Sequence, residues 1–267
     1  MEIRDPIHGT ILLSDAEHAV ISSSFYQRLR SIKQLGFSEF SFPGATHNRY
    51  LHSLGVFHLA GLVFDNLFAK YDFGKPGKKD LWRQVVKLAA LLHDVGHGPL
   101  SHTTEEVMPP LADLNVKAYK NLRDDFDFDS ESIIFDRKAN HEDYSIKIIT
   151  DSPLSEILSK NFADFSPLHV ACLIDKTLQH PDDFFVDKDV DFRTILSQIV
   201  SSELDVDRMD YLERDAYFCG TSYGKVDLSW LIANILIHIE NNNACLGLNR
   251  KALYTCLLYT SPSPRDS

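Results

Sequence analysis

The chain has 267 residues, 44% of them hydrophobic and 24% charged, which is typical of a globular protein with a sizeable core. Its formal net charge of −11 disfavours long polyanions, so we expect no specific nucleic-acid partner. The four cysteines show no C-x-x-C spacing, which disfavours a disulfide framework and a thiolate zinc site. No apolar run approaches the ~20 residues that span a bilayer, and the first residues resemble no export signal. We therefore expect a cytoplasmic protein with no membrane partner.

Hydrophobic periodicity predicts an all-α fold, a mainly helical bundle with at most short strand pieces. A capping box formed by Ser14 and Glu17 opens the first helix. Only Thr10–Leu13 and Ala244–Leu248 have the composition of strands. Further helices are predicted over Tyr26–Leu35, His52–Tyr71, Leu81–His93, His141–Thr150, Leu154–Asn161, Pro167–Gln179, Arg193–Ser202, Asp205–Phe218 and Asp227–Ile239.

Neither an internal repeat nor a long linker divides the chain, so residues 1–255 are predicted to form a single domain. Residues 121–140 are acidic and irregular, which indicates a surface insertion. Residues 256–267 have no periodicity and resemble translated adapter sequence. We expect this tail to be non-native and the domain to be truncated near residue 255; a disordered tail rich in serine and proline is the alternative.

Histidine and aspartate residues carry the strongest chemical signal. The pair His93-Asp94, with His52 upstream and Asp207 downstream, is a mixed nitrogen and oxygen set that suits Mn, Fe, Zn, Ni or Mg. An isolated His-Asp pair is common and by itself indicates little. Residues 93–102, however, contain three histidines together with two glycines and a proline, which would weaken a purely structural helix. We therefore predict a divalent metal site here.

Three runs of sequence, residues 47–55, 93–102 and 203–211, resemble the successive motifs of the HD-domain phosphohydrolases. Two more runs, Asp5-Pro6-Ile7-His8-Gly9 and residues 27–36, resemble the deoxynucleoside triphosphate triphosphohydrolase branch of that family, which includes the dGTPases. All five occur in the order and at the spacing of the family. The combination is far more specific than the His-Asp pair alone.

The resemblance implies an enzyme that hydrolyses a deoxynucleoside triphosphate at the α-phosphorus, giving the deoxynucleoside and inorganic triphosphate. It implies that one divalent metal ion is held by His52, His93, Asp94 and Asp207. It also implies that the phosphates are surrounded by His97, His102 and His141. We expect His102 to protonate the leaving 5′ oxygen, and Glu105 to orient it.

Substrate contacts follow from the same resemblance. Arg49 and Arg208 are expected to neutralise phosphate charge, since arginine suits bidentate phosphate contacts. The deoxyribose would be framed by Gln34, Leu35, Tyr211 and Asp215, the tyrosine ring excluding a ribose 2′-hydroxyl. Core packing is the alternative for Tyr211, and a solvated helix end for Gln34. The resemblance further implies a homo-oligomer for the full-length protein.

Two other functions stay open at this point. One is a different HD hydrolase that cleaves nucleoside monophosphates or a cyclic or signalling nucleotide; its minimal site does not require the histidines that follow His93-Asp94. The other is a catalytically silent HD module that senses nucleotides or binds a partner. The complete set of four ligands disfavours a silent module, because the loss of one ligand is the simplest route to a dead site.

Overall fold

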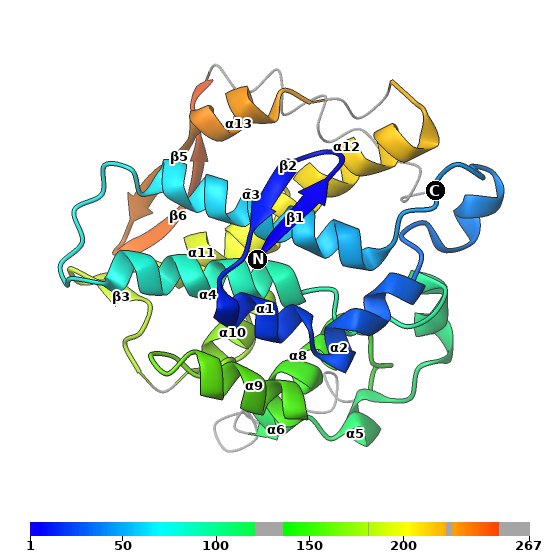
Figure 1. Cartoon of the computed structure of the whole chain (residues 1–267). Helices are drawn as coiled ribbons and strands as arrows, with labels where there is room; N and C mark the ends of the chain where they lie inside the picture. The colour runs from blue at the N-terminus through cyan, green and yellow to red at the C-terminus, as the bar shows by residue number, and fades with distance from the viewer. Residues whose placement is uncertain (121–135, 181, 223–225, 251–267) are drawn as a thin grey trace.

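The computed structural model describes residues 1–120, 136–180, 182–222 and 226–250 (Figure 1). Two long helices, α3 (Arg49–Leu67) and α4 (Lys78–Leu92), cross the centre of the molecule. The other helices are α1 (Asp15–Ile21), α2 (Ser24–Gln27), α5 (Leu111–Leu114), α6 (Lys117–Lys120), α8 (His141–Asp151), α9 (Pro153–Asn161), α10 (Pro167–Ile174), α11 (Arg193–Val200), α12 (Val206–Cys219) and α13 (Leu228–Asn234). Short 3₁₀ helices are η1 (Arg28–Ser31), η2 (Gly36–Phe40) and η3 (Ser101–Val107).

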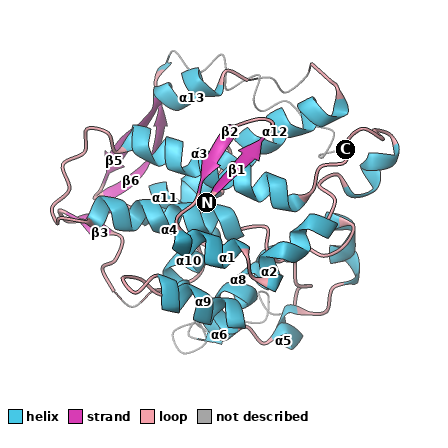
Figure 2. Cartoon of the chain, in the orientation of Figure 1, coloured by secondary structure: helices cyan, strands magenta, loops and turns pink. Residues whose placement is uncertain are grey.

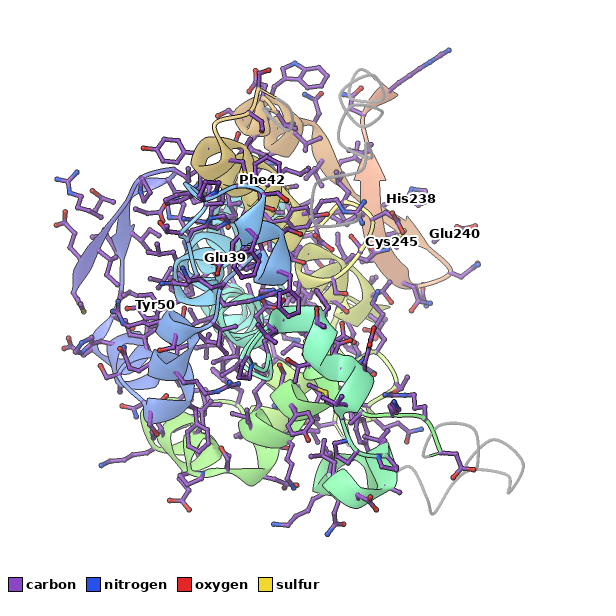
Figure 3. The ribbon with its side chains drawn as sticks, turned by 90° about the vertical axis from the view of Figure 1, so that its right-hand side faces the viewer. Glu39, Phe42, Tyr50, His238, Glu240 and Cys245 are labelled. Carbon is purple, nitrogen blue, oxygen red and sulfur yellow. The ribbon has the colours of Figure 1, made fainter. Side chains whose placement is uncertain are left out.

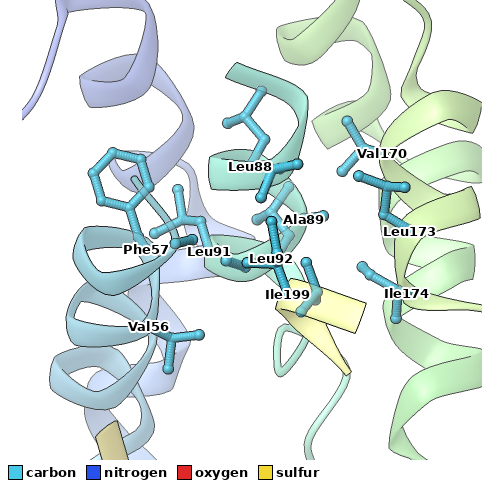
Figure 4. Close-up of a cluster of buried hydrophobic side chains, with 14 of the residues drawn as sticks. Val56, Phe57, Leu88, Ala89, Leu91, Leu92, Val170, Leu173, Ile174 and Ile199 are labelled. Atoms are coloured by element: carbon cyan, nitrogen blue, oxygen red, sulfur yellow. The ribbon is translucent and has the colours of Figure 1, made fainter. Parts of the chain in front are cut away.

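Helix α4 lies between α3 on one side and α10 on the other, and the core is formed at these two contacts (Figure 4). Leu88, Leu91 and Leu92 of α4 are fully buried. Phe57 of α3 and Leu173 of α10 pack against them from the two sides. Each such side chain contributes about 1.5–3 kcal/mol to stability by its burial. The core thus fixes the C-terminal end of α4, which is followed directly by two of the predicted metal ligands, His93 and Asp94.

Two small sheets accompany the helices (Figure 2). One is the antiparallel hairpin of β1 (Glu2–Asp5) and β2 (Gly9–Leu12). The other has the strand order β3-β4-β6-β5, from β3 (Val186–Asp187), β4 (Val190–Asp191), β5 (Ile235–Glu240) and β6 (Asn243–Leu248). His238 of β5 pairs with Cys245 of β6 at one side of the molecule (Figure 3). The mainly helical prediction is confirmed, but a purely all-α fold is wrong.

Both predicted strands are present, in β2 and β6, within one residue of their expected bounds. The helix predicted over Asp227–Ile239 is wrong in its second half, because α13 ends at Asn234 and β5 begins at Ile235. Isoleucines alternate with other residues from Ile235 to Ile239, and that period of two is completed by pairing with β6.

Two other helices end five or more residues earlier than predicted, and α3, predicted to reach Tyr71, ends at Leu67. The helix predicted over Tyr26–Leu35 stops at Gln27 and continues only as the η1 turn, since Lys33 bridges to Asn48 instead. The helix predicted over Pro167–Gln179 stops at Ile174. There the Arg193 guanidinium donates to the carbonyl oxygens of residues 172, 175, 176 and 178, which satisfies them without further helical turns.

Part of the predicted insertion, residues 121–135, and the predicted non-native tail, residues 256–267, lie outside the described residues. Within the described residues, none of the helices has both the length and the apolar character needed to cross a membrane. The single-domain organisation stays a prediction.

Helices α3 and α12 approach each other closely at Gly55. A Cβ built on Gly55 would lie 1.8 Å from Oδ1 of Asp210. We expect Gly55→Ala to destabilise the protein by about 1–3 kcal/mol, because α12 must move away from α3. Urea unfolding measures the change. At Gly44 the nearest atom to a built Cβ is 3.4 Å away, so Gly44→Ala is the matched control. Equal stability of the two variants would contradict the close approach.

Candidate active site

The four predicted metal ligands come together at the junction of α3, α4 and α12. His52 lies on α3, His93 at the C-terminal cap of α4 with Asp94 directly after it, and Asp207 in the first turn of α12. Nε2 of His52 is 2.8 Å from Oδ1 of Asp207 and 3.6 Å from Oδ2 of Asp94. Nε2 of His93 is 3.4 Å from Oδ1 of Asp94 and 3.6 Å from Oδ1 of Asp207.

The ligand atoms of His52, His93 and Asp207 are all close enough together to share one metal ion. Asp94 approaches this group with both oxygens, Oδ2 toward His52 and Oδ1 toward His93. With metal–ligand distances of about 2.1 Å, neighbouring ligand atoms lie about 3.0 Å apart in an octahedral site and about 3.4 Å apart in a tetrahedral one. His52 and Asp94 are fully buried, whereas the Asp207 side chain is 26% exposed. The site is therefore closed on the side of the core and open on the side of Asp207.

The imidazoles of His52 and His93 both direct Nε2 toward the carboxylates of the cluster. Nε2 of His52 and Nε2 of His93 are buried, and neither makes a hydrogen bond within the described residues. Nδ1 of His93 donates to the carbonyl of Ala90 at 2.8 Å, so the lone pair of the neutral ring is on Nε2. Burial opposes the charged ring, but the carboxylates of Asp94 and Asp207 outweigh it and raise the pKa of His93 to about 9. The cluster thus favours positive charge at its centre, and these residues fit a divalent cation.

Arg49 supports the site from the interior. Its guanidinium is fully buried and donates to Oδ2 of Asp94 and to the hydroxyl of Ser101. Burial alone would raise the pKa of Asp94, but Arg49, together with His93 and His97, holds that pKa well below its usual range. Asp94 is therefore ionised and fixed in direction.

Two polar side chains, those of Ser145 and Arg28, hold the turn that follows Asp94. The Gly96 N–H donates to Oγ of Ser145 at 2.8 Å, and Oγ of Ser145 donates to the His93 carbonyl at 2.6 Å. The guanidinium of Arg28 donates to the carbonyls of Val95 and His97. Gly96 has no room for a side chain, since a Cβ would lie 2.0 Å from the carbonyl oxygen of the first residue of α8. Helix α8 therefore docks directly on this turn.

A second cluster, formed by His97, His102, Glu105 and His141, stands beside the metal ligands. The rings of His97 and His141 are stacked with centroids 3.8 Å apart, and His102 is edge-on to both. One carboxylate oxygen, Oε1 of Glu105, contacts Nδ1 of His102 at 3.2 Å and also Nδ1 of His141. These four side chains are close enough to be considered for a metal. Parallel rings direct their lone pairs side by side, however, and not toward one point, so the cluster suits proton transfer and anion contact better than coordination.

The environment of this cluster differs from ring to ring. Burial and the nearby Arg49 hold the pKa of His97 well below its usual range, so this ring is neutral. His102 has a side chain 49% exposed. Burial raises the pKa of Glu142, which also lines the pocket described below. The carboxylate that contacts Nδ1 of His141 is that of Glu105.

Both clusters open into one pocket of about 250 Å³. It is lined by His93, Asp94, His102, His141, Glu142, Ile174, Val200, Ser201, Asp205, Asp207, Arg208 and Tyr211. Burial and the neighbouring Asp207 raise the pKa of Asp205 to about 7. The lining thus combines three of the four predicted metal ligands, all but His52, with two histidines of the second cluster, and with an arginine and a tyrosine that were predicted to contact substrate.

Of the residues predicted to contact substrate, Gln34, Leu35, Arg49 and Asp215 do not line this pocket as the described residues form it. All four are buried. The predicted residues His52, His97 and Glu105 are also absent from this described lining. The backbone N–H of Gln34 donates to the carbonyl of His47, and Nε2 of His47 lies 2.8 Å from Oδ1 of Asp215. Among the residues that the structure describes, the side-chain amide of Gln34 and Oδ2 of Asp215 have no hydrogen-bond partner, which is uncommon for buried groups of this kind.

Fold and site define a helical domain that gathers histidine and aspartate side chains for a divalent metal ion. Residues 49–215 match the family model described as the HD domain, which is more than half of the chain. The chain belongs to the HD domain family. The matched segment begins at Arg49, so the β1–β2 hairpin lies outside it.

The relatives agree with this assignment. YwfO of Bacillus subtilis, an uncharacterized protein, is 35% identical over 86% of this chain and 42% of its own length. Human deoxynucleoside triphosphate triphosphohydrolase SAMHD1 is 32% identical over 82% of this chain and 33% of its own length. The crystal structure of a hypothetical protein of Aquifex aeolicus has a TM-score of 0.69 and 31% identity, covering 97% of this chain and 56% of the other. The chain thus spans between a third and somewhat over half of the length of these proteins.

Several residues of the site were not found from the sequence. Ser145, Arg28 and Asp210 all contact the predicted ligands or the turn between them. The only available signal was helical spacing, since Ser145 is four residues after His141 and Asp210 three after Asp207.

Ser145→Ala tests the contact between α8 and the turn. Removing the hydroxyl leaves the Gly96 N–H and the His93 carbonyl buried without a partner, which costs about 1–3 kcal/mol. Urea unfolding measures this loss. Ser159→Ala, on the exposed face of α9, is the matched control and should be nearly neutral. If both variants have the stability of the wild type, the hydroxyl is not a structural link.

Proposed function

We propose that the protein is a metal-dependent phosphohydrolase of nucleotides, and that its substrates are deoxynucleoside triphosphates, cleaved to a deoxynucleoside and inorganic triphosphate. The observation that carries this proposal is one pocket lined by His93, Asp94 and Asp207 together with His102 and His141. His52 lies beside it, with Nε2 2.8 Å from Oδ1 of Asp207. The sequence similarity of the chain to human deoxynucleoside triphosphate triphosphohydrolase SAMHD1 supports a deoxynucleoside triphosphate as the substrate. The metal ligands are His52, His93, Asp94 and Asp207.

A divalent cation at these ligands supplies a Lewis acid for a phosphoryl oxygen and activates water at neutral pH. The protein itself contributes position and charge, which dominate phosphoryl transfer. Arg208 lines the pocket and is the side chain proposed to contact the outer phosphates. Arg49 is proposed to act through Asp94, which it fixes, more than by direct contact, since it is fully buried.

His102 is the proposed general acid. Because the Glu105 carboxylate can only accept, Nδ1 of His102 is the donor in their contact, and Nε2 is the atom that exchanges a proton with substrate. As water attacks the α-phosphorus and the bond to the 5′ oxygen breaks, that proton goes to the leaving oxygen. Glu105 positions both His102 and His141, and His97 and His141 are proposed to face the phosphates.

The sugar is proposed to be recognised by Gln34, Leu35, Tyr211 and Asp215. The unpartnered amide of Gln34 and carboxylate oxygen of Asp215 could receive a 3′-hydroxyl, which would satisfy both. Tyr211 lines the pocket and is 7% exposed, so its ring is proposed to pack against C2′. A homo-oligomer of the full-length protein is part of the same proposal.

A different HD hydrolase, acting on monophosphates or cyclic nucleotides, is the alternative. Incubation with each dNTP and rNTP and with Mn²⁺, Mg²⁺ or Fe²⁺ distinguishes them by the phosphate product. We expect inorganic triphosphate from dNTPs. Release of monophosphate would support the alternative, and bound but intact nucleotide would support a silent sensing module.

Two substitutions separate metal binding from proton transfer. His93→Ala should abolish metal binding and turnover together. His102→Ala should retain the metal and slow turnover by about 10²–10⁴-fold, because only the general acid is lost. Metal content and kcat, measured on the same preparations, decide the matter. Full activity of His102→Ala would show that His102 is not the general acid.

Tyr211→Ala tests sugar discrimination. Loss of the ring should reduce the preference for dNTP over rNTP, which we expect to be at most about 100-fold from steric exclusion alone. Tyr211→Phe keeps the ring and should keep the preference. The measurement is the ratio of kcat/KM for the two substrates; an unchanged ratio in Tyr211→Ala would assign the residue to core packing.

A further inference from the structure

Asp210 is a fully buried carboxylate that contacts the metal ligand His52 from behind. Its Oδ2 is 2.7 Å from Nδ1 of His52, and its Oδ1 is 2.6 Å from Nε2 of His8. One helical turn further on, Arg214 donates from Nε to Oδ2 at 2.7 Å and from Nη2 to Oδ1 at 2.9 Å. Each carboxylate oxygen therefore has two partners.

These contacts decide which nitrogen of His52 carries the proton. Nε and Nη2 of Arg214 donate to the two oxygens of Asp210, so the carboxylate is held in a bidentate ion pair. An ionised carboxylate only accepts hydrogen bonds, so Nδ1 of His52 is the donor. The lone pair of the neutral ring is then on Nε2, which faces Asp94 and Asp207. Metal-binding histidines typically have such a carboxylate on the opposite nitrogen.

His8 reaches Asp210 because of the turn between β1 and β2. Oδ1 of Asp5 accepts the N–H groups of Ile7 and His8, both at 2.9 Å, and Gly9 has a φ of +74°. Oδ2 of Asp5 accepts from Nη1 of Arg214 at 2.9 Å. The turn is thus tied to α12, and the His8 side chain is only 6% exposed. This hairpin is outside the segment that matches the HD domain.

We propose that Asp210 is a positioning residue of the metal centre, and that the N-terminal hairpin belongs to that centre through His8. Together they hold the His52 ring with Nε2 presented to the cation. The proposal rests on the proposed metal site and is independent of which nucleotide is the substrate.

A purely structural role is the competing explanation, and metal affinity distinguishes the two. A structural role predicts loss of stability with unchanged affinity of the folded protein. A positioning role predicts weaker binding by a protein that is still folded, because the His52 ring is free to rotate or to change tautomer. Removal of such outer partners typically costs 10–100-fold in metal affinity.

The experiment measures Mn²⁺ binding to metal-free protein by equilibrium dialysis, with circular dichroism to establish that each variant is folded. Asp210→Asn and His8→Leu should bind Mn²⁺ about 10–100-fold more weakly than wild type. His8→Gln retains a donor near the position of Nε2 and should recover most of the affinity. Asp187→Asn is the matched control, since Asp187 is a buried carboxylate that accepts from Gly74 near the start of α4, away from the site.

Wild-type affinity in folded Asp210→Asn and His8→Leu would overturn the proposal. If Asp210→Asn does not fold, the comparison of His8→Leu with His8→Gln decides alone: equal affinities in the two overturn the role of the His8 donor, and recovery in His8→Gln supports it. A wild-type protein that binds no Mn²⁺ would overturn the metal centre itself, and this proposal with it.

Discussion

Two imidazole nitrogens and two carboxylates meet where α3, α4 and α12 come together, and the charges of this cluster are satisfied only when a positive charge lies among them. In the protein alone that charge is a proton, as the raised pKa of His93 indicates. Buried arginines already neutralise the cluster from behind: Arg49 contacts Asp94, and Arg214 contacts the carboxylate behind His52. The side of the cluster that faces the pocket is accessible to the proposed metal ion and its substrate.

The segment from His93 to His102 divides the pocket into two parts with different chemistry. Its first two residues are proposed metal ligands, and its later histidines, His97 and His102, join His141 in the second cluster. Both parts keep their relation because α8 docks on the turn without an intervening side chain, at Gly96. The proposed roles account for the density of histidine along this segment, since coordination and proton transfer require imidazoles in separate environments.

The hairpin adds a feature that the HD match does not contain. Segments that are about 200 residues apart in sequence, His8 and Asp210, form one hydrogen bond directly behind a metal ligand. The four-stranded sheet, by contrast, lies at another side of the molecule and pairs exposed side chains such as His238 (Figure 3). The two sheets therefore differ in their relation to the site, and the smaller one is the one that contacts it.

The sequence by itself determined the main helices, because apolar periodicity is a local pattern. The motif resemblance predicted His52, His93, Asp94 and Asp207 as metal ligands, and that assignment stays a prediction. The sequence did not determine where α13 ends and β5 begins at Ile235, because the partner strand decides that boundary. Nor did it reveal Asp210 or Ser145, because a polar residue within a helix looks the same in sequence whether it faces solvent or a buried ligand. Only tertiary packing brings such a side chain to its partner, and burial then makes the contact obligatory.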